Sequence, residues 1–382
     1  MNRTLYDQEH EDFRATVRKF LEAEIAPYMD EWEAAGIFPK QIYARCGDLG
    51  IAGLNVPEEY GGGGVSDYRF NSVVLEEVAL TYTGLGALGL HANIVTPYFT
   101  RFADAEQKTR WLPGIAAGTT MCSIAMTEPG TGSDLSGIVT NAVRDGDDWI
   151  LNGAKTFITG GINADLVVVA CRTSSNEQDR RGGLSLLVVE DGMPGFSRGR
   201  KLDKLGTHSV DTAELFFEDV RVPAANMLGE EGRGFEYLTS NLVPERLSQS
   251  VSAVAAAQAA LNAAVAYVKE RKVFGKPVAA FQNTKFVLSE CATDIAAGQA
   301  LVDQAILAYN SDDLSVSDVA KVKLFVTEMA GRVVDKCLQL HGGYGYMREY
   351  PISRLYADIR LARIAAGSSE IMKTVIAKSL TL

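Results

Sequence analysis

The chain has few of the residues that mark a disulfide-stapled or metal-bound protein. Its 382 residues include five cysteines, and no two of them form a C-x-x-C pair. The four histidines are equally scattered, so the spacing of a usual zinc site is missing and no metal site is predicted. We interpret the cysteines as reduced, mostly buried thiols in a cytosolic type of compartment. They are Cys46, Cys122, Cys171, Cys291 and Cys337.

The chain also lacks an excess of positive charge, since its net charge is −11. This argues against nucleic acid or an anionic membrane as the main partner, but not against a small anionic ligand in a local basic pocket. The first residues, MNRTLYDQEHEDF, are acidic and resemble neither a signal nor a transit peptide, so a cytoplasmic protein is expected. The uncharged run Leu247 to Val268 is mostly alanine with several polar residues, which favours a buried bundle helix over a membrane span.

The chain divides into three blocks by its hydrophobic pattern. Residues 1–120 carry apolar residues at helical spacing, separated by loops rich in Pro and Gly. Residues 121–231 contain short runs rich in Val, Leu and Phe between turn signals, which predict a small antiparallel β-domain. Residues 232–382 return to helices, predicted at 237–272, 279–310, 315–341 and 351–380. The predicted fold class is α+β, mainly α, in the order α, β, α.

Several glycine-rich stretches allow both a structural and a ligand-binding interpretation. GLGALG at 84–89 fits G-x-G-x-x-G, but a helical pattern precedes it, so a turn between helices is predicted instead of a dinucleotide site. AMTEPGTGSD at 125–134 forms either a turn or a cradle for a phosphate or polar ring edge. ERKVFGK at 270–276 and HGGYGY at 341–346 are either helix caps or phosphate contacts. TFITGG at 156–161 indicates the end of a strand.

A carboxylate directly after a proline opens the long uncharged helix, in the sequence PERL. An acidic residue in the first helical turn suits the helix dipole, so Glu245 is explained by capping about as well as by function.

Seven motifs together resemble the acyl-CoA dehydrogenase family, and the match covers essentially the whole chain. They are VPEEYGG, MTEPGTGSD, FITGG, FFEDVRVP, ERKVFGK, QLHGGYGYMREYPI and GSSEIM, in the order and spacing of that family. The resemblance implies an N-terminal helical domain, a central antiparallel β-barrel-like domain and a C-terminal four-helix bundle. Several motifs look closest to long-chain acyl-CoA dehydrogenases, a branch that serves fatty acid beta-oxidation.

The resemblance implies an FAD cofactor held by residues of two subunits, in a homotetramer built as a dimer of dimers. Within one subunit, the implied flavin contacts are Ile124, Ala125, Met126, Thr127, Ser133, Phe157, Ile158, Thr159, Ser368 and Glu370. The residues implied to hold the FAD of a neighbouring subunit are Arg271, Phe274, Gln282, Gln339, Leu340, His341, Gly342 and Gly343.

The implied reaction converts a fatty acyl-CoA, of medium or long chain, to a trans-2-enoyl-CoA. Most members of the family carry the catalytic glutamate in a YEGT motif, where this chain has Ala366 in IAAGSS. A subset, which includes isovaleryl- and long-chain enzymes, places the base at an ER pair like that in PERL, so Glu245 is the expected base. The backbone N–H of Ala366 is then expected to bind the thioester carbonyl, with Ser133, Arg246 and Gly367 also near the substrate.

Three alternatives to this interpretation remain open. The substrate is either a straight-chain or a branched, isovaleryl-type acyl-CoA. The electron acceptor is either an electron-transfer flavoprotein, as expected, or oxygen in an acyl-CoA oxidase. The third alternative is a flavin- or acyl-CoA-binding scaffold without a base, which Ala366 favours and Glu245 opposes.

Overall fold

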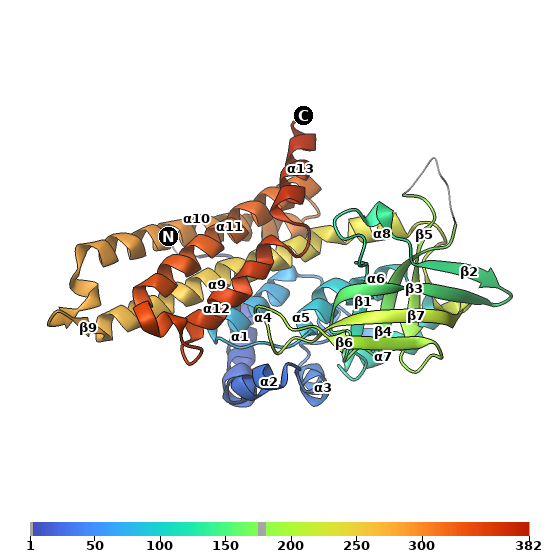
Figure 1. Cartoon of the computed structure of the whole chain (residues 1–382), viewed down its shortest axis with the longest axis horizontal. Helices are drawn as coiled ribbons and strands as arrows, with labels where there is room; N and C mark the ends of the chain where they lie inside the picture. The colour runs from blue at the N-terminus through green and yellow to red at the C-terminus, as the bar shows by residue number, and fades with distance from the viewer. Residues whose placement is uncertain (1–2, 175–180, 382) are drawn as a thin grey trace.

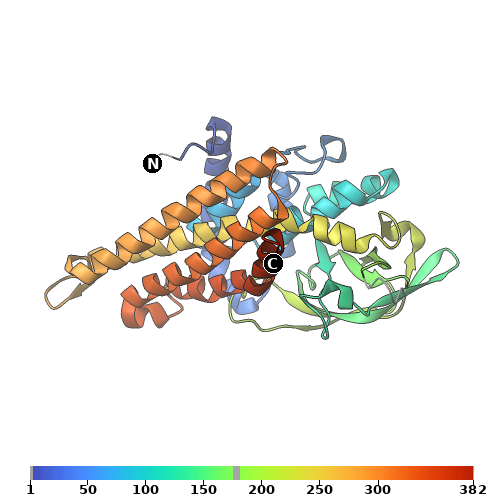
Figure 2. The same ribbon diagram turned by 90° about the horizontal axis from the view of Figure 1, so that it is seen from above.

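The computed structural model describes residues 3–174 and 181–381. The sheet of the middle segment lies at one end of the molecule, and the long C-terminal helices extend to the other (Figure 1). The N-terminal helices lie against both parts, which the view from above also shows (Figure 2). The predicted order of helices, sheet and helices is therefore confirmed.

The N-terminal segment folds into short helices around its own apolar core. In α1 (Gln8–Phe20) the side chains of Val17 and Phe20 are buried on one face. A π-helical turn, Leu21–Ile25, and a 3-10 turn, Ala26–Tyr28, follow without a break in the chain's helical course. The other elements of this segment are α2 (Met29–Ala35), α3 (Lys40–Asp48), a 3-10 turn at Glu58–Tyr60, α4 (Tyr68–Leu80), α5 (Leu88–Leu90), a π-helical turn at His91–Val95, α6 (Thr96–Phe102) and α7 (Ala105–Ala116).

The GLGALG stretch forms the turn between α4 and α5, as predicted. Gly86 has a positive φ of 54°, and a Cβ at this position would lie 2.3 Å from the Tyr43 hydroxyl oxygen. Glycine is therefore required by backbone conformation and close packing. The element that precedes the turn is a helix, so a dinucleotide-binding interpretation does not hold.

The middle segment forms one mainly antiparallel sheet in the order β6-β7-β3-β2-β4-β5-β8, with β1 added in parallel to β4. In β4, Val168 faces a core shared with α6 and α7, whereas Val169 faces the core enclosed by the sheet itself. This alternation has the two-residue period of a strand, and burial on both faces explains the continuous apolar sequence. The strands are β1 (Cys122–Ala125), β2 (Asn141–Asp145), β3 (Asp148–Thr159), β4 (Leu166–Arg172), β5 (Leu184–Glu190), β6 (Phe196–Lys201), β7 (Thr212–Pro223) and β8 (Met227–Leu228).

The C-terminal segment is a bundle built around the alanine-rich helix. After the short α8 (Gly234–Ser240), α9 (Leu242–Glu270) packs against α4, α10 (Gln282–Asn310) and α11 (Val316–His341). The stretch Gly234–Glu270 is long and apolar enough to cross a bilayer, but α9 is largely buried in the bundle core, as the sequence predicted. Its small side chains permit close helix approach. A two-stranded hairpin, β9 (Lys272–Val273) and β10 (Lys276–Pro277), and a 3-10 turn at Val278–Ala280 connect α9 to α10.

The predicted last helix, 351–380, is wrong as a single element. The structure has α12 (Pro351–Ile359), a 3-10 turn at Arg360–Arg363, and a separate α13 (Ser369–Ser379). The chain breaks because Ala366 and Gly367 adopt positive φ angles of 55° and 88°. Left-handed residues cannot continue a right-handed helix. The break lies at the position where the family resemblance implies the substrate carbonyl.

Candidate active site

Glu245 lies in the first turn of α9, directly after the buried Pro244. Within residues 3–174 and 181–381, no group donates a hydrogen bond to its carboxylate, so the contacts do not support hydrogen-bonded capping. Burial raises the pKa of Glu245 to about 7, although the nearby cations Arg246 and Lys323 act to lower it. A carboxylate with a pKa near neutrality and no donor attached is well suited to accept a proton.

Arg246 connects this helix turn to the break before α13. Its side chain is buried, and its Nε donates to the Ala366 carbonyl oxygen at 3.4 Å. Its Nη1 is also buried and has no hydrogen-bond partner in the described part of the chain. Burial lowers the pKa of Arg246, while Glu245 raises it. The guanidinium thus lies under the turn that carries Ala366.

Lys323 of α11 bonds to the same turn. Its Nζ donates to the carbonyl oxygens of Ala365 and Gly367 at 2.6 Å and 2.5 Å. Burial and the nearby Arg246 lower the pKa of Lys323 to about 8, against the raising effect of Glu245. Arg246 and Lys323 therefore both bond to the 365–367 turn, and the partly exposed Glu245 lies near enough to both cations to interact with them electrostatically.

Gly367 cannot readily be another residue. Its φ of 88° favours glycine, and an added Cβ would lie 2.8 Å from the Met372 Cε and 3.7 Å from an Arg246 nitrogen. Ser368 then begins α13 by accepting a hydrogen bond from the Ile371 N–H, and Glu370 is exposed in the first turn of that helix.

The structure brings the loop after β1 next to the end of β3. The Thr156 N–H donates to the Thr127 carbonyl oxygen at 2.9 Å, and Lys155 donates to the Met126 carbonyl oxygen at 3.0 Å. Phe157 sits at an irregularity of β3 with a φ of 59°, and the residue is 68% exposed. An exposed aromatic ring on a strained strand end is a suitable platform for a planar ligand.

The other residues of this segment that are implied to contact the flavin differ in their solvent exposure. Met126 and Thr127 are partly exposed, and Ser133 is exposed on the following loop. Ile124, Ala125 and Ile158 are buried. Thr159 is partly buried, and its carbonyl oxygen accepts a hydrogen bond from the Ser123 hydroxyl. The buried members of the set therefore present little surface of their own.

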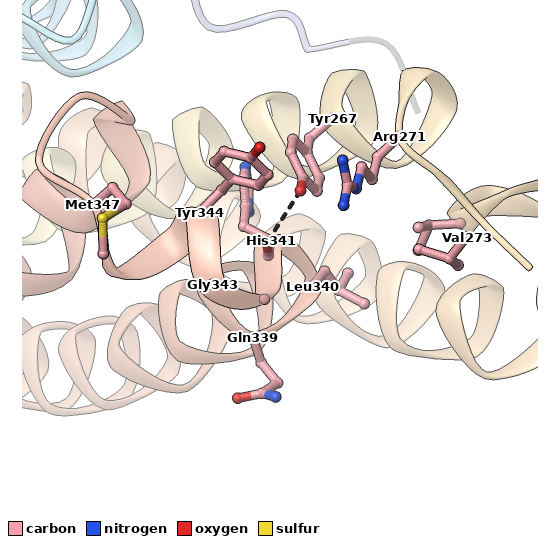
Figure 3. Close-up of a pocket in the computed structure, with 11 residues that line it drawn as sticks. Tyr267, Arg271, Val273, Gln339, Leu340, His341, Gly343, Tyr344 and Met347 are labelled. Carbon is pink, nitrogen blue, oxygen red and sulfur yellow. Dashed lines mark hydrogen bonds between the residues drawn. The ribbon is translucent and has the colours of Figure 1, made fainter.

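A cavity of about 450 Å³ lies at the far end of the bundle. Arg271 lies over the Tyr344 ring, with its guanidinium carbon 5.3 Å from the ring centroid. The Tyr267 hydroxyl donates to the His341 carbonyl oxygen, and Figure 3 shows Gln339 pointing away from these rings. The lining residues are Tyr267, Arg271, Val273, Val278, Gln339, Leu340, His341, Gly342, Gly343, Tyr344 and Met347.

The chemistry of this cavity fits a phosphate-bearing ligand. Its described lining includes the Arg271 guanidinium and no carboxylate. A Cβ added to Gly342 or Gly343 would meet nothing within 4 Å, so the backbone is open to a ligand there. The His341 ring is not presented, because it is buried, stacked on Tyr267 and bonded to the Cys337 carbonyl oxygen.

Within one chain, the predicted cofactor residues around β1 and β3 lie far from those of the distal cavity and the β9–β10 turn. β9, at the tip of the bundle, is far from β1 and β3 in Figure 1. Phe274, in the turn between β9 and β10, is 92% exposed with a φ of 49°, and Gln282 is exposed at the start of α10. One chain therefore does not bring the two sets together.

Comparison with known proteins identifies the family. Family models for the acyl-CoA dehydrogenase N-terminal, middle and C-terminal domains match residues 7–119, 123–220 and 232–381. The long-chain specific acyl-CoA dehydrogenase of rat mitochondria, Rattus norvegicus, is 42% identical over 378 residues, which cover 99% of this chain and 88% of the relative. The chain belongs to the acyl-CoA dehydrogenase family. It is thus a member of a family of flavoprotein oxidoreductases, and its predicted fold class is confirmed.

Solved structures of the family agree over the whole chain. An acyl-CoA dehydrogenase from Geobacillus kaustophilus is 48% identical, covers 100% of both chains and has a TM-score of 0.97. A glutaryl-CoA dehydrogenase from Mycobacterium smegmatis, solved in complex with FADH2, is 29% identical with a TM-score of 0.90 and covers 99% of this chain and 95% of its own. Relatives that act on different acyl groups therefore share this fold, so the family does not determine the substrate.

Sequence reasoning did not predict the contacts that Lys155 and Lys323 make as buried side chains. Lys323 occupies a position on the apolar face of α11, four residues after Val319 and three before Val326, both buried. A lysine on the apolar face of a helix indicates a buried charge that needs a partner, and this signal could have been found in the sequence. The burial of Lys155 was harder to predict from the sequence, because its strand is irregular at this point and the two-residue alternation is interrupted.

Proposed function

We propose that this chain is an FAD-dependent acyl-CoA dehydrogenase that converts a medium- or long-chain fatty acyl-CoA to the trans-2-enoyl-CoA. One observation carries the proposal most directly. Glu245 has a pKa raised to about 7, and its carboxylate accepts no hydrogen bond within the described residues. Arg246 and Lys323 hold the turn of Ala366, the residue at the family's more common base position.

In the proposed mechanism, the ionised carboxylate of Glu245 takes the α-proton of the thioester. The Ala366 N–H donates to the thioester carbonyl oxygen, where negative charge develops as that proton leaves. The partly buried site limits water around Glu245, which keeps its basicity high. The chemistry that bound FAD would supply is acceptance of the β-hydrogen as hydride.

The residues for the cofactor divide into two sets. Backbone atoms of the loop after β1 and the exposed ring of Phe157 would hold the flavin ring, and Ser368 and Glu370 would close that side. Arg271 and the open glycines of the distal cavity would hold the pyrophosphate part of an FAD bound by a neighbouring chain. Their separation within one chain supports a homo-oligomer, and we propose the tetramer of the family.

The preference for longer acyl chains rests on two supports. The rat relative is described as long-chain specific. Ala366 also leaves the space that a glutamate side chain would fill. The proposed electron acceptor is an electron-transfer flavoprotein, and the proposed location is the cytoplasm.

The deciding experiment is anaerobic bleaching of the bound flavin by palmitoyl-, octanoyl- and isovaleryl-CoA. We expect fast bleaching by the straight chains and slow bleaching by isovaleryl-CoA. Dye reduction without oxygen consumption would separate a dehydrogenase from an oxidase. Flavin that stays yellow with every acyl-CoA would contradict the proposed function and favour a scaffold.

The proposed tetramer has its own test. Light-scattering mass and FAD content would be measured for the wild type and for Arg271→Gln. We expect a tetramer in both and reduced FAD content in the variant. A monomer that retains full FAD would contradict the shared site.

A further inference from the structure

Lys323 uses its charge in an unusual way for a buried lysine. Its side chain is 1% exposed, yet within the described residues it forms no ion pair and instead donates to two main-chain carbonyl oxygens. Burying an ammonium group is costly unless it gains strong interactions. Both of its acceptors belong to the 365–367 turn, so the hydrogen bonds that offset the cost of burying this charge are all made to one short stretch of backbone.

The first of these bonds acts on a particular peptide group. The Ala365 carbonyl and the Ala366 N–H belong to the same planar, conjugated peptide unit. A cation bonded to the carbonyl oxygen draws electron density away from the nitrogen and makes the N–H a stronger donor. The 2.6 Å bond from Lys323 to the Ala365 oxygen therefore strengthens the donor that the Ala366 nitrogen presents.

The second bond fixes the direction of that donor. Ala366 has a φ of 55°, a left-handed conformation that is unfavourable for alanine. Lys323 holds the carbonyls on both sides of Ala366, and Arg246 holds the Ala366 carbonyl itself. Three hydrogen bonds from two buried cations thus maintain a conformation that alanine does not favour.

We propose that Lys323 is a positioning residue for catalysis, which aims and polarises the Ala366 N–H toward the thioester carbonyl. The inference rests on the proposed function, since it assigns Lys323 to the carbonyl whose α-proton Glu245 removes. Lys323 touches neither substrate nor cofactor in this role. It acts through the Ala365–Ala366 peptide.

The test compares Lys323→Met with Lys321→Met in the FAD-loaded enzyme. Lys321 lies two residues earlier on α11, where it is exposed and paired with Asp318. We expect Lys323→Met to slow flavin reduction at saturating palmitoyl-CoA by about 10- to 100-fold, less than the loss of a whole oxyanion donor. KM should change little, and Lys321→Met should match the wild type.

A spectroscopic readout separates polarisation from mere structural support. The carbonyl stretch of a bound, carbonyl-13C-labelled trans-2-hexadecenoyl-CoA is measured by difference Raman spectroscopy. We expect the wild type and Lys321→Met to lower this frequency relative to the free ligand, and Lys323→Met to return it toward the free value. Lys323→Gln, which keeps N–H donors without the charge, should fall between them.

The outcomes are distinct. A folded, flavin-loaded Lys323→Met with the wild-type carbonyl frequency and reduction rate would overturn the inference and leave the proposed function intact. Loss of flavin or of folding in both the Met and Gln variants would assign Lys323 to folding and overturn it as well. If no acyl-CoA bleaches the flavin of the wild-type enzyme, the proposed function itself is contradicted.

Discussion

Lys155 in the sheet and Lys323 in the bundle are both buried, and both bond to the carbonyls of a loop at the site. Lys155 also contacts a carboxylate, with its Nζ 2.8 Å from a Glu128 oxygen. Glu128 accepts two further hydrogen bonds, from the N–H groups of Val139 and Thr140. Burial raises the pKa of Glu128, but the bonds from Lys155 and the backbone outweigh it and leave the pKa lowered.

The second pair is arranged differently. Lys323 directs its hydrogen bonds to backbone, and Glu245 receives none within the described residues. Burial then dominates, and the pKa of Glu245 rises to about 7. The comparison teaches that a buried lysine lowers the pKa of a glutamate that it contacts directly, so that the glutamate stays ionised. When the lysine is bonded to backbone carbonyls instead, the nearby glutamate keeps a raised pKa and can act as a base.

The largest expected effect comes from Glu245→Gln. Removing the base should lower the rate of flavin reduction by acyl-CoA by about 10²- to 10⁴-fold, the usual contribution of general base catalysis. Anaerobic stopped-flow absorbance measures this rate. Glu236→Gln, on the exposed surface of α8, is the matched control. Near-normal turnover of Glu245→Gln would end its assignment as the base.

Glu128→Gln and Lys155→Met should damage stability instead of chemistry. Removing one partner of a buried ion pair strands the other charge, at a cost of about 3–5 kcal/mol in the free energy of unfolding. Denaturant unfolding measures the loss. If either variant were as stable as the wild type but slow in flavin reduction, the contrast between the two lysines would fail.

The pH dependence of kcat/KM should follow the ionisation of Glu245. Its pKa of about 7 predicts a rise through pH 7, with a rate about tenfold below the plateau one pH unit under it. Because the Lys323 cation lowers this pKa, Lys323→Met should move the rise to higher pH. An unchanged midpoint in that variant would mean that the two charges do not interact.

Stability should vary with pH in the opposite sense. Glu245 in the unfolded chain ionises near its ordinary pKa of 4.5, but the folded protein resists ionisation up to about 7. The contribution of Glu245 to the free energy of unfolding is therefore fully present below pH 4.5 and is lost as the pH rises through 7. Glu245→Gln should melt above the wild type at pH 8, and equal melting temperatures would contradict the raised pKa.

The smallest expected effect is that of Gly367→Ala. Forcing a side chain to a φ of 88° should lower stability by about 1–2 kcal/mol. Gly50→Ala is the control, because Gly50 has a φ of 72° and nothing within 4 Å of an added Cβ. Both should lose similar stability, measured by thermal unfolding, but only Gly367→Ala should slow flavin reduction. Equal activity of the two would indicate that the turn tolerates distortion.

The sequence was informative where periodicity is strong and less so where long-range contacts decide. Short apolar runs between turn signals predicted the sheet, long helical patterns predicted α9, α10 and α11, and the helical pattern before GLGALG excluded a dinucleotide site. The break at Ala366 was missed, because an alanine gives no local sign of a positive φ that distant cations maintain. Glu245 stood out because its helix is otherwise uncharged, but the contacts of Lys323 and Lys155 depend on tertiary structure.

The separation of the two proposed cofactor-binding sets within one chain has a genetic consequence. In the proposed oligomer, a subunit altered at Arg271 would keep its own base but deprive its neighbour of cofactor. A subunit altered at Glu245 would do the reverse. Hybrids of the two inactive parents would then contain some complete sites, so complementation between alleles is expected.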